Sequence, residues 1–409
     1  MAKALRGLVQ VCVAVEGPTA GAVPPPLPPG GAKPPTGPAP LPWVKGGAAD
    51  GSALPPLTRQ MLERVLPPLV SRLQLDDDKD TVAAASEALA DVAKLVGPPA
   101  VAARAEALAK VVKQLLQQAH PCQTAGVEAE ELGMDDEADH DEALWEAVSE
   151  LLTSLPKVLG AAWQPHFAAL LPHLLPYLGA GHPSSDRSLA VGVIAESMHQ
   201  LEAEAAPLIA QVVPIALRHS ADEDGTCRQN ATFCLGVMAQ HCPAQTLAHM
   251  QAILTALQPR LAADEEHPVR DNAVGALGRL ALAHGSALPL EGIVPAMLAQ
   301  LPLTADCGEN APALRALMQL THAEPTRAVM APHVPALLSA LGRGLALSPA
   351  GEGKGEKGEV DLLGAELRGE VSLFLQWLAS QVPAQQLAAA TAPLPESERA
   401  VLASSGLTC

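Results

Sequence analysis

The sequence of 409 residues is poor in aromatic side chains, because Phe, Trp and Tyr together make up only 2% of it. A β-sandwich of this size would be richer in Tyr, Phe, Thr and Ile. The apolar fraction is nevertheless 48%, so a core has to be built mainly from Leu, Ala and Val. Ala and Leu are strong helix formers. The composition therefore favours a protein of closely packed helices.

Cysteine pairs and long apolar runs are also missing. The seven cysteines are odd in number and contain no CxxC, and Cys227, Cys234 and Cys242 lack the spacing of a zinc site. We expect buried thiols in a reducing compartment rather than metal ligands or disulfides. No run of 18 apolar residues occurs, so neither a membrane span nor a membrane partner is expected.

Motifs of catalysis and cofactor binding are absent as well. The sequence has no Walker A motif, no HExxH and nothing like GxSxG. Its match to GxGxxG begins at Gly353, where no strand precedes it and the surroundings are charged and of low complexity. The sequence therefore predicts a protein that is not an enzyme and that binds no cofactor or metal ion.

Acidic residues outnumber basic ones, 44 to 26, which gives a formal net charge of −18. Such a charge favours basic partners and argues against nucleic acid as a direct ligand. Acidity that serves only to keep the protein soluble is the alternative interpretation.

A recurrence at 42 residues is the strongest positive signal. Residues 221–231 read ADEDGTCRQNA and residues 263–273 read ADEEHPVRDNA, with six of eleven positions identical. Repeats of about 40–47 residues are typical of paired-helix HEAT and armadillo units. Such a unit cannot bury its apolar face alone, so the units stack into an array that binds partners along its surface.

Helical periodicity over residues 57–405 predicts an all-α fold, a right-handed α-α superhelix of about seven helix pairs. The expected pairs are 57–74 with 79–96, 98–118 with 142–158, 164–179 with 185–201, 205–220 with 226–241, 245–262 with 268–284, 290–302 with 308–322, and 329–346 with 359–380. A last helix near 384–404 is expected to cap the array.

Four segments lie outside this pattern. Residues 16–56 are rich in Pro and Gly and are expected to form a flexible linker, with a PxxP ligand as the alternative. An acidic loop is expected at 128–142 and a charged loop at 348–359. Residues 1–15 look either like a weak signal peptide or like a remnant helix of a preceding repeat, and the second interpretation is preferred.

The recurrence places Asp222 six residues before Arg228, and Asp264 six residues before Arg270. An Asp in the turn before the second helix of a pair is expected to cap that helix. The Arg is then expected to bond the Asp of an adjacent repeat. These four residues form the predicted structural ladder.

Two groups of residues are predicted to bind partners. An acidic run is expected to attract Lys- and Arg-rich proteins by speeding their encounter, and a solvated loop is the alternative. The inner face of the array, lined by the second helices of the pairs, is expected to supply ordered contacts. The first group is Glu128, Glu130, Glu131, Asp135, Asp136, Glu137 and Asp139, and the second is Arg228, Asn230, Arg270, Asp271 and Asn272.

Several of these stretches resemble the importin-β (karyopherin-β) family, in particular its C-terminal repeats. The stretches are RQNATFCLGVMAQH at 228–241, HPVRDNAVGALGRLA at 267–281, SDRSLAVGVIAE at 185–196, LPL at 301–303 and LPESERAVLASSGL at 394–407. An acidic insertion within a repeat also fits. The resemblance covers about residues 57–405.

The resemblance implies a nuclear transport receptor that carries basic proteins, such as histones and ribosomal proteins, from the cytoplasm to the nucleus. Ran in its GTP state would release the cargo, and nucleoporins would be further partners. Full-length members are longer and have their main Ran contacts in N-terminal repeats, so a fragment or an incomplete gene model is expected here. A structural HEAT-repeat scaffold subunit of a multiprotein complex is the alternative function.

Overall fold

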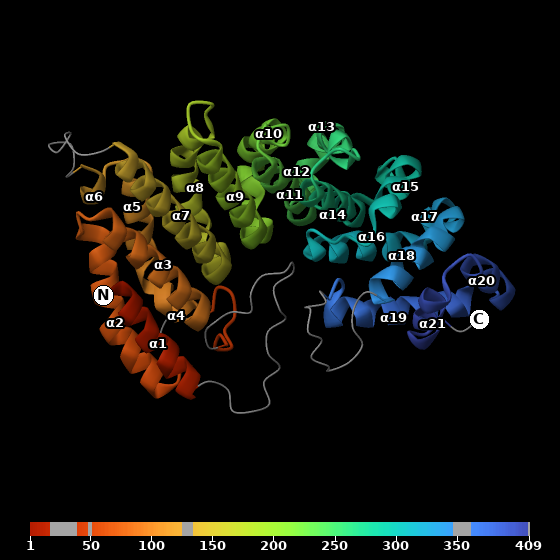
Figure 1. Ribbon diagram of the computed structural model, residues 1–409, viewed down its shortest axis with the longest axis horizontal. Coiled ribbons are helices and arrows are strands. Elements are labelled where there is room, and N and C mark those ends of the chain that lie inside the picture. The colour runs from red at the N-terminus through yellow and green to blue at the C-terminus, as the bar shows by residue number, and fades with distance from the viewer. Residues whose placement is uncertain (17–38, 48–50, 125–133, 347–360, 408–409) are drawn as a thin grey trace. The chain divides into compact units, whose positions relative to one another are not determined.

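A computed structural model describes residues 1–16, 39–47, 51–124, 134–346 and 361–407, without the side chains of 134–140. The described residues form helices joined by short connections and contain no β-strand (Figure 1). The chain divides into two compact units, of which the first reaches to Val212 and the second begins at Val213. The predicted all-α class is confirmed. Within the described residues, no helix combines the length and the apolar character needed to cross a membrane.

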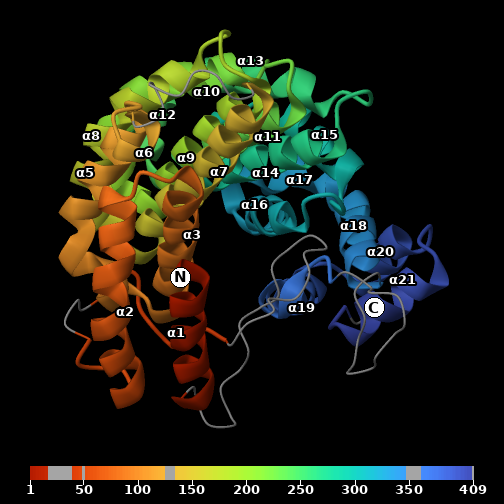
Figure 2. The ribbon, with the colours of Figure 1, turned by 60° about the vertical axis from the view of Figure 1, so that its left-hand side comes forward.

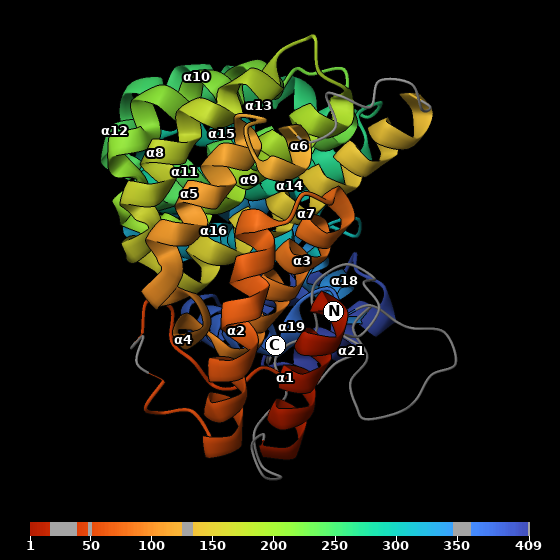
Figure 3. The same ribbon diagram turned by 90° about the vertical axis from the view of Figure 1, so that its left-hand side faces the viewer.

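The helices of the first unit form two layers. One layer holds α1 (Ala2–Glu16), α3 (Lys79–Val96), α7 (Met134–Leu159) and α9 (Ser184–Leu201), each packed against the next. The other holds α2 (Pro56–Leu75), α5 (Ala105–Leu116) and α8 (Gln164–Leu174), with the short α4 (Pro98–Val101) and α6 (Pro121–Thr124) in the connections. Figures 2 and 3 show α1 beside α2 and α3, against which it packs.

The second unit repeats this plan. In one layer α11 (Gly225–His241) packs on α14 (His267–His284), and α14 packs on α16 (Asn310–His322). The other layer includes α13 (Met250–Leu257), α15 (Leu290–Gln300) and α17 (Glu324–Met330) (Figure 1). The remaining helices are α10 (Ile209–His219), which crosses the unit boundary, α12 (Pro243–Thr246), α18 (Val334–Ala346), α19 (Gly364–Gln381), α20 (Ala384–Thr391) and α21 (Glu396–Ser404).

We call the first helix of each pair the A helix and the second the B helix. The predicted B helices agree closely with α3, α9, α11, α14 and α16. The A helices are more broken than predicted: the segment 245–262, for example, divides into α12, α13 and two 3-10 turns. Prolines explain the breaks, because Pro243 starts α12 and Pro259 lies at the start of a 3-10 turn. Proline lacks the N–H that a continuous helix needs, so it fits best in a first turn, although α2 and α8 also hold prolines further in.

Small residues let the B helices of the second unit approach one another closely. A Cβ added to Gly236 of α11 would lie 2.8 Å from the Cα of Ala276 in α14. A Cβ added to Gly278 of α14 would lie 2.6 Å from the carbonyl oxygen of Pro312 in α16. Both distances are shorter than real Cβ contacts, so only glycine fits where these backbones meet.

Residues 39–47 form an ordered strap, which corrects the flexible linker predicted for all of 16–56. Leu41 is buried, and its N–H donates to the carbonyl of Leu95 near the end of α3 at 2.9 Å. The last four carbonyls of a helix have no partner within the helix. A strap that crosses helix ends and satisfies them is therefore held in place despite its proline-rich composition.

The same strap reaches two further helix ends of the first unit. The N–H of Gly46 donates to the carbonyl of Val158 near the end of α7 at 2.9 Å. Lys45 places its ammonium group 2.7 Å from the carboxylate of Glu202, just past α9, and 3.2 Å from the carbonyl of Gln200. A cation at the C-terminal end of a helix also interacts favourably with the helix dipole. The strap thus ties the ends of three consecutive B helices together.

Trp43 anchors the strap against Gly97, the residue that ends α3. Its indole N–H donates to the carbonyl of Lys94 at 3.0 Å. Gly97 has a φ of +84°, and a Cβ added there would overlap the Trp43 side chain. Glycine is therefore required at this position both by its backbone conformation and by the ring that covers it.

We expect Gly97→Ala to lower the free energy of unfolding by about 2–4 kcal/mol, because backbone strain and overlap with Trp43 add together. The matched control is Gly285→Ala, where φ is +50° but nothing lies within 4 Å of the added Cβ. This control should lose only about 1–2 kcal/mol. Urea denaturation followed by circular dichroism measures both losses. Equal losses would contradict the placement of Trp43.

Candidate partner-binding surface

The turn before α11 departs from the predicted ladder. Asp224, not Asp222, caps the helix, and its carboxylate accepts the N–H of Cys227 at 2.7 Å. Asp222 instead accepts the N–H of Asp224 at 3.0 Å and contacts His219 at 3.2 Å. The predicted cap is wrong by two positions because α11 begins at Gly225, and the capping residue directly precedes it.

Arg228 does link adjacent repeats, but its partners are glutamates rather than the predicted aspartate. Its guanidinium lies 2.8 Å from Glu265 and 3.0 Å from Glu266, and it donates to the carbonyls of Asp222 and Glu223. The side chains of Arg228 and Glu265 are only 13% and 7% exposed. Burial alone would lower the pKa of Arg228, but the hydrogen bonds and charge of Glu265 and Glu266 raise it overall.

The corresponding residues of the next repeat form no ladder. Arg270 donates to the carbonyl of Ala263 at 3.1 Å, and Glu266 rather than Asp264 precedes α14. Neither Arg270 nor Asp264 takes part in an ion pair within the described ranges, so the ladder prediction is wrong for both. Arg270 and Asn230 are half-buried, and their role as partner contacts stays a prediction.

Asp271 and Asn272 are buried between repeats, which corrects their predicted role as inner-face contacts. They are 7% and 1% exposed. The Asp271 carboxylate accepts the N–H groups of Ala305 and Asp306 at 2.8 and 2.9 Å, and Asn272 donates to the Asp306 carboxylate at 3.0 Å. Burial raises the pKa of Asp271, although the two N–H donors oppose this. These side chains hold the turn of the next repeat and face no partner.

A buried ion pair that no sequence motif indicated continues the links between B helices. Arg279 of α14 bonds both carboxylate oxygens of Glu309, which directly precedes α16, one of them at 2.9 Å. Its Nε donates to Gln240 of α11 at 3.1 Å, and its guanidinium lies 5.1 Å from the ring centroid of Phe233. Arg279 therefore joins three consecutive repeats.

The first unit has a different surface on its B helices, which we call the acidic stripe. It consists of Glu87 and Asp91 of α3 and Glu142, Glu146 and Glu150 of α7. Within each helix the members are four residues apart, so they share one face. The other sides of α3 are covered by α1, α2 and α7. The stripe therefore lies on the open side of the B-helix layer.

Two ion pairs fix the register of α3 and α7. Lys79 lies 2.8 Å from Asp141 near the start of both helices, and Lys94 bonds Glu150 further along both. Because the pairings advance in the same direction, the two helices run parallel. Burial alone would lower the pKa of Lys94, but the hydrogen bonds and charges of Glu150 and Asp91 together raise it. The carboxylates of the stripe are thus held on a rigid support.

Part of the negative charge of the stripe is not neutralised by any cation in the described part of the chain. Glu87 and Glu146 are exposed and have no ion-pair partner among the described residues. Asp91 is shared between Arg6 at 2.7 Å and Lys94 at 3.2 Å. Exposed carboxylates on a rigid face attract cationic side chains at long range and bind them at short range. The sequence prediction placed the acidic surface at 128–142 and missed the stripe, although the spacing of acidic residues by four along these helices is a signal that could have located it.

The acidic run predicted as a loop over 128–142 is helical from Met134 onward, where α7 begins. Acidic side chains are favourable in the first turns of a helix, because the dipole is positive there. Residues Glu128, Glu130 and Glu131, the side chains of Asp135, Asp136, Glu137 and Asp139, and the predicted loop 348–359 all lie outside the described part of the chain. The described Glu142 joins the run to the stripe.

A cavity of about 410 Å³ opens near the start of α7. Trp145 and Tyr177 line it with stacked rings whose centroids are 4.5 Å apart. The carboxylates of Asp141, Glu142 and Asp186 line it too. Aromatic rings beside carboxylates suit the aliphatic stem and cationic head of a Lys or Arg side chain. The cavity therefore adds further carboxylates, and two aromatic rings, beside the stripe.

Comparison with known sequences identifies relatives of the chain. A family model described as a HEAT-like repeat matches residues 226–280. Importin-4 of Mus musculus is 33% identical over 259 residues, covering 62% of this chain and 24% of that protein. Importin-4 of Homo sapiens is 32% identical over 254 residues, covering 61% and 23%. A probable importin subunit beta-4 of Schizosaccharomyces pombe is 26% identical over 221 residues, covering 52% and 21%. The chain spans about a quarter of these relatives.

Solved structures of Kap121p share the fold. Kap121p bound to RanGTP superposes with a TM-score of 0.61 and 15% identity, covering 85% of this chain and 30% of that one. Kap121p bound to the SUMO protease Ulp1p gives 0.60 and 15%, covering 86% and 31%. The predicted HEAT-type superhelix is confirmed by this likeness. With the importin relatives, it confirms the resemblance to the importin-β family.

We expect Arg228→Ala to lower the free energy of unfolding by about 1–3 kcal/mol, because the nearly buried Glu265 would lose one of its two cationic partners and keep only Arg260. Arg270→Ala is the matched control one repeat later. It should cost less than about 0.5 kcal/mol, since Arg270 bonds only a carbonyl at the surface. Chemical denaturation of both variants measures the difference. An unchanged midpoint for Arg228→Ala would show that the link between these repeats contributes nothing.

Proposed function

We propose that the chain is part of a nuclear transport receptor of the importin-β type that binds basic cargo proteins for import into the nucleus. The acidic stripe carries this proposal. It presents Glu87 and Glu146, two exposed carboxylates without an ion-pair partner among the described residues, in a chain that is similar to importins. A structural scaffold would not need an uncompensated patch of one charge on its open face.

The stripe and the adjacent cavity together suggest how a basic segment is held. Lysine or arginine side chains of an extended cargo segment pair with the exposed carboxylates along α3 and α7. One further cationic side chain enters the cavity beside Trp145, with its head near Asp186 or Glu142. Because the ion pairs between α3 and α7 already fix the two helices that carry these carboxylates, little backbone ordering entropy is lost on binding.

Further partners follow from the proteins that share the fold. Solved structures show Kap121p bound to RanGTP, to Nup53p, to Pho4p, to Ste12p and to the SUMO protease Ulp1p. We extend this to a receptor that contains the present chain: it binds basic cargo such as histones or ribosomal proteins, contacts nucleoporins, and releases cargo to Ran-GTP. Such a receptor moves between cytoplasm and nucleus and catalyses no reaction.

The double variant Glu87→Gln/Glu146→Gln should weaken binding of a fluorescent Lys-rich peptide by about threefold to tenfold at low ionic strength. Each lost exposed ion pair contributes up to about 1 kcal/mol. The effect should shrink at about 0.15 M salt, where charges are screened beyond about 8 Å. Fluorescence anisotropy at both salt concentrations measures the dissociation constants.

The matched control is Glu63→Gln/Glu106→Gln, which removes two exposed carboxylates from the A helices α2 and α5 and changes the net charge equally. It should leave the affinity within about twofold of wild type, since these carboxylates lie in the other layer. Equal weakening by both variants would mean that only net charge matters. If wild type binds no basic peptide even at low salt, the receptor proposal is contradicted and the structural-scaffold alternative is favoured.

A further inference from the structure

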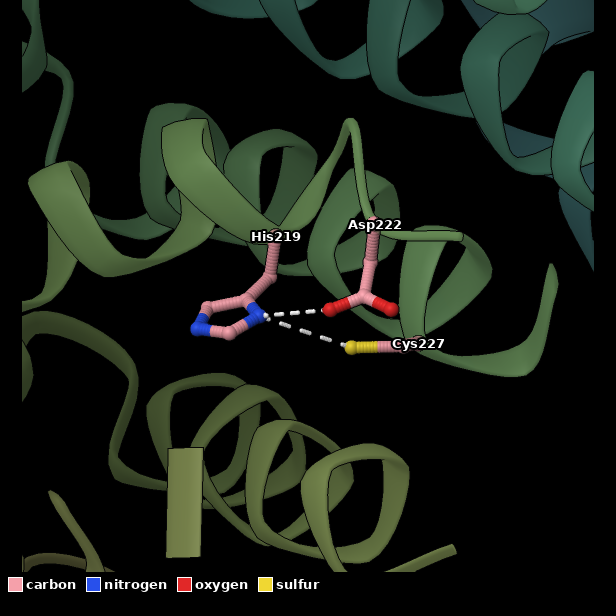
Figure 4. Close-up of side chains that lie close together, drawn as sticks. All are labelled: His219, Asp222 and Cys227. Carbon is pink, nitrogen blue, oxygen red and sulfur yellow. Dashed lines mark hydrogen bonds and ion pairs between the residues drawn. The ribbon is translucent and has the colours of Figure 1, made fainter. Parts of the chain in front are cut away.

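Three side chains of the types that bind metal ions lie close together at the turn between α10 and α11. His219 is the last residue of α10, Asp222 lies in the turn, and Cys227 is the third residue of α11. The Nδ1 of His219 lies 3.2 Å from the Oδ2 of Asp222 and 3.7 Å from the Sγ of Cys227 (Figure 4). The three donor atoms all lie within 4.8 Å of one another.

These separations match those within a zinc coordination sphere. Zinc binds His nitrogen and carboxylate oxygen at about 2.0–2.2 Å and Cys sulfur at about 2.3 Å, usually in a tetrahedron. In a tetrahedron of those lengths the nitrogen and oxygen lie about 3.3 Å apart, and the nitrogen and sulfur about 3.6 Å apart. The nitrogen of His219 therefore already lies at chelating distances from the oxygen of Asp222 and the sulfur of Cys227.

The surroundings hold the three ligands in place. The Oδ1 of Asp222 accepts the N–H of Asp224 at 3.0 Å, which leaves Oδ2 directed at His219. Asp224 also caps α11 through the N–H of Cys227 at 2.7 Å, and Arg228 donates to the carbonyl of Asp222 at 2.9 Å. Hydrogen bonds that orient ligands in this way are typical of metal sites.

Neither a simple hydrogen bond nor a catalytic triad accounts for all three side chains. A hydrogen bond from neutral His219 to Asp222 explains that pair, but it gives no reason for the thiol of Cys227 to face the same nitrogen. A catalytic Cys–His–Asp arrangement needs the thiol and the carboxylate at opposite nitrogens of the ring, whereas here both face Nδ1. The thiol is also fully buried, at 0% exposure, so no substrate reaches it.

We propose that His219, Asp222 and Cys227 bind one zinc ion, with water in the fourth position on the side of Asp222. This site differs from the sequence-based expectation of no metal, which rested on cysteine spacing and on the absence of metal-binding motifs such as HExxH. Binding would release the thiol proton of Cys227, while His219 would bind as the tautomer that carries its proton on Nε2, so zinc binding would weaken at low pH. The ion would join the end of α10 to the start of α11.

The test uses the full chain without an affinity tag, freed of metal by chelation. Titration with Co²⁺ should produce the sulfur-to-cobalt charge-transfer band with one ion per chain, and Zn²⁺ should abolish that band by competition. Zn²⁺ should also raise the melting temperature, because it binds only the folded cluster. No band and no thermal shift in wild type would overturn the proposal.

Cys227→Ser should abolish the band and weaken Zn²⁺ binding at least tenfold, in the range typical of a lost metal contact. Cys234→Ser is the matched control, since Cys234 lies on the same helix and is buried, with a pKa raised by that burial to about 12. It should behave as wild type. A band that persists in Cys227→Ser would place the ion elsewhere and overturn the proposal. If Cys227→Ser fails to fold, Asp222→Asn takes its place as the test variant. Its amide oxygen still accepts the N–H of Asp224, so the turn keeps that hydrogen bond.

Discussion

The close approach of neighbouring B helices is the constraint on which the second unit depends. Glycine at 236 and 278 removes the side chain where the backbones of α11, α14 and α16 meet. That approach brings Arg279 within reach of Glu309 on one side and Gln240 on the other. If the helices lay further apart, these buried polar groups would lose their partners at a cost of several kcal/mol.

The two units use the polar residues of their B helices differently. In the second unit Arg228, Asp271 and Arg279 are occupied by bonds to the adjacent repeats. In the first unit the ion pairs between helices leave Glu87 and Glu146 exposed and without ion-pair partners among the described residues. A residue already bonded within the array has to lose that bond before it can bind another protein, whereas a free carboxylate loses only water. This difference favours the first unit as the cation-binding surface.

Local composition misled the prediction in two places, for related reasons. The strap is rich in proline and glycine, but its backbone and Trp43 satisfy the open carbonyls of helix ends. The acidic run contains many like charges, but α7 begins at Met134, where the helix dipole favours them. In both segments the stabilising partner is a helix end, and a composition count does not contain that partner.

The sequence alone determined the repeat, the all-α class and the positions of most B helices, because helix periodicity and a 42-residue recurrence are local properties of the chain. The same stretches carried the resemblance to the importin-β family. The sequence also indicated that Asp222 and Arg228 act at the turn between helices. Only the tertiary structure decided their partners, and it showed that Asp271 and Asn272 are buried while Glu87 and Glu146 are exposed. The reason is that burial and pairing on a B helix depend on the next repeat, about 40 residues away, and on the rotation with which the two helices pack.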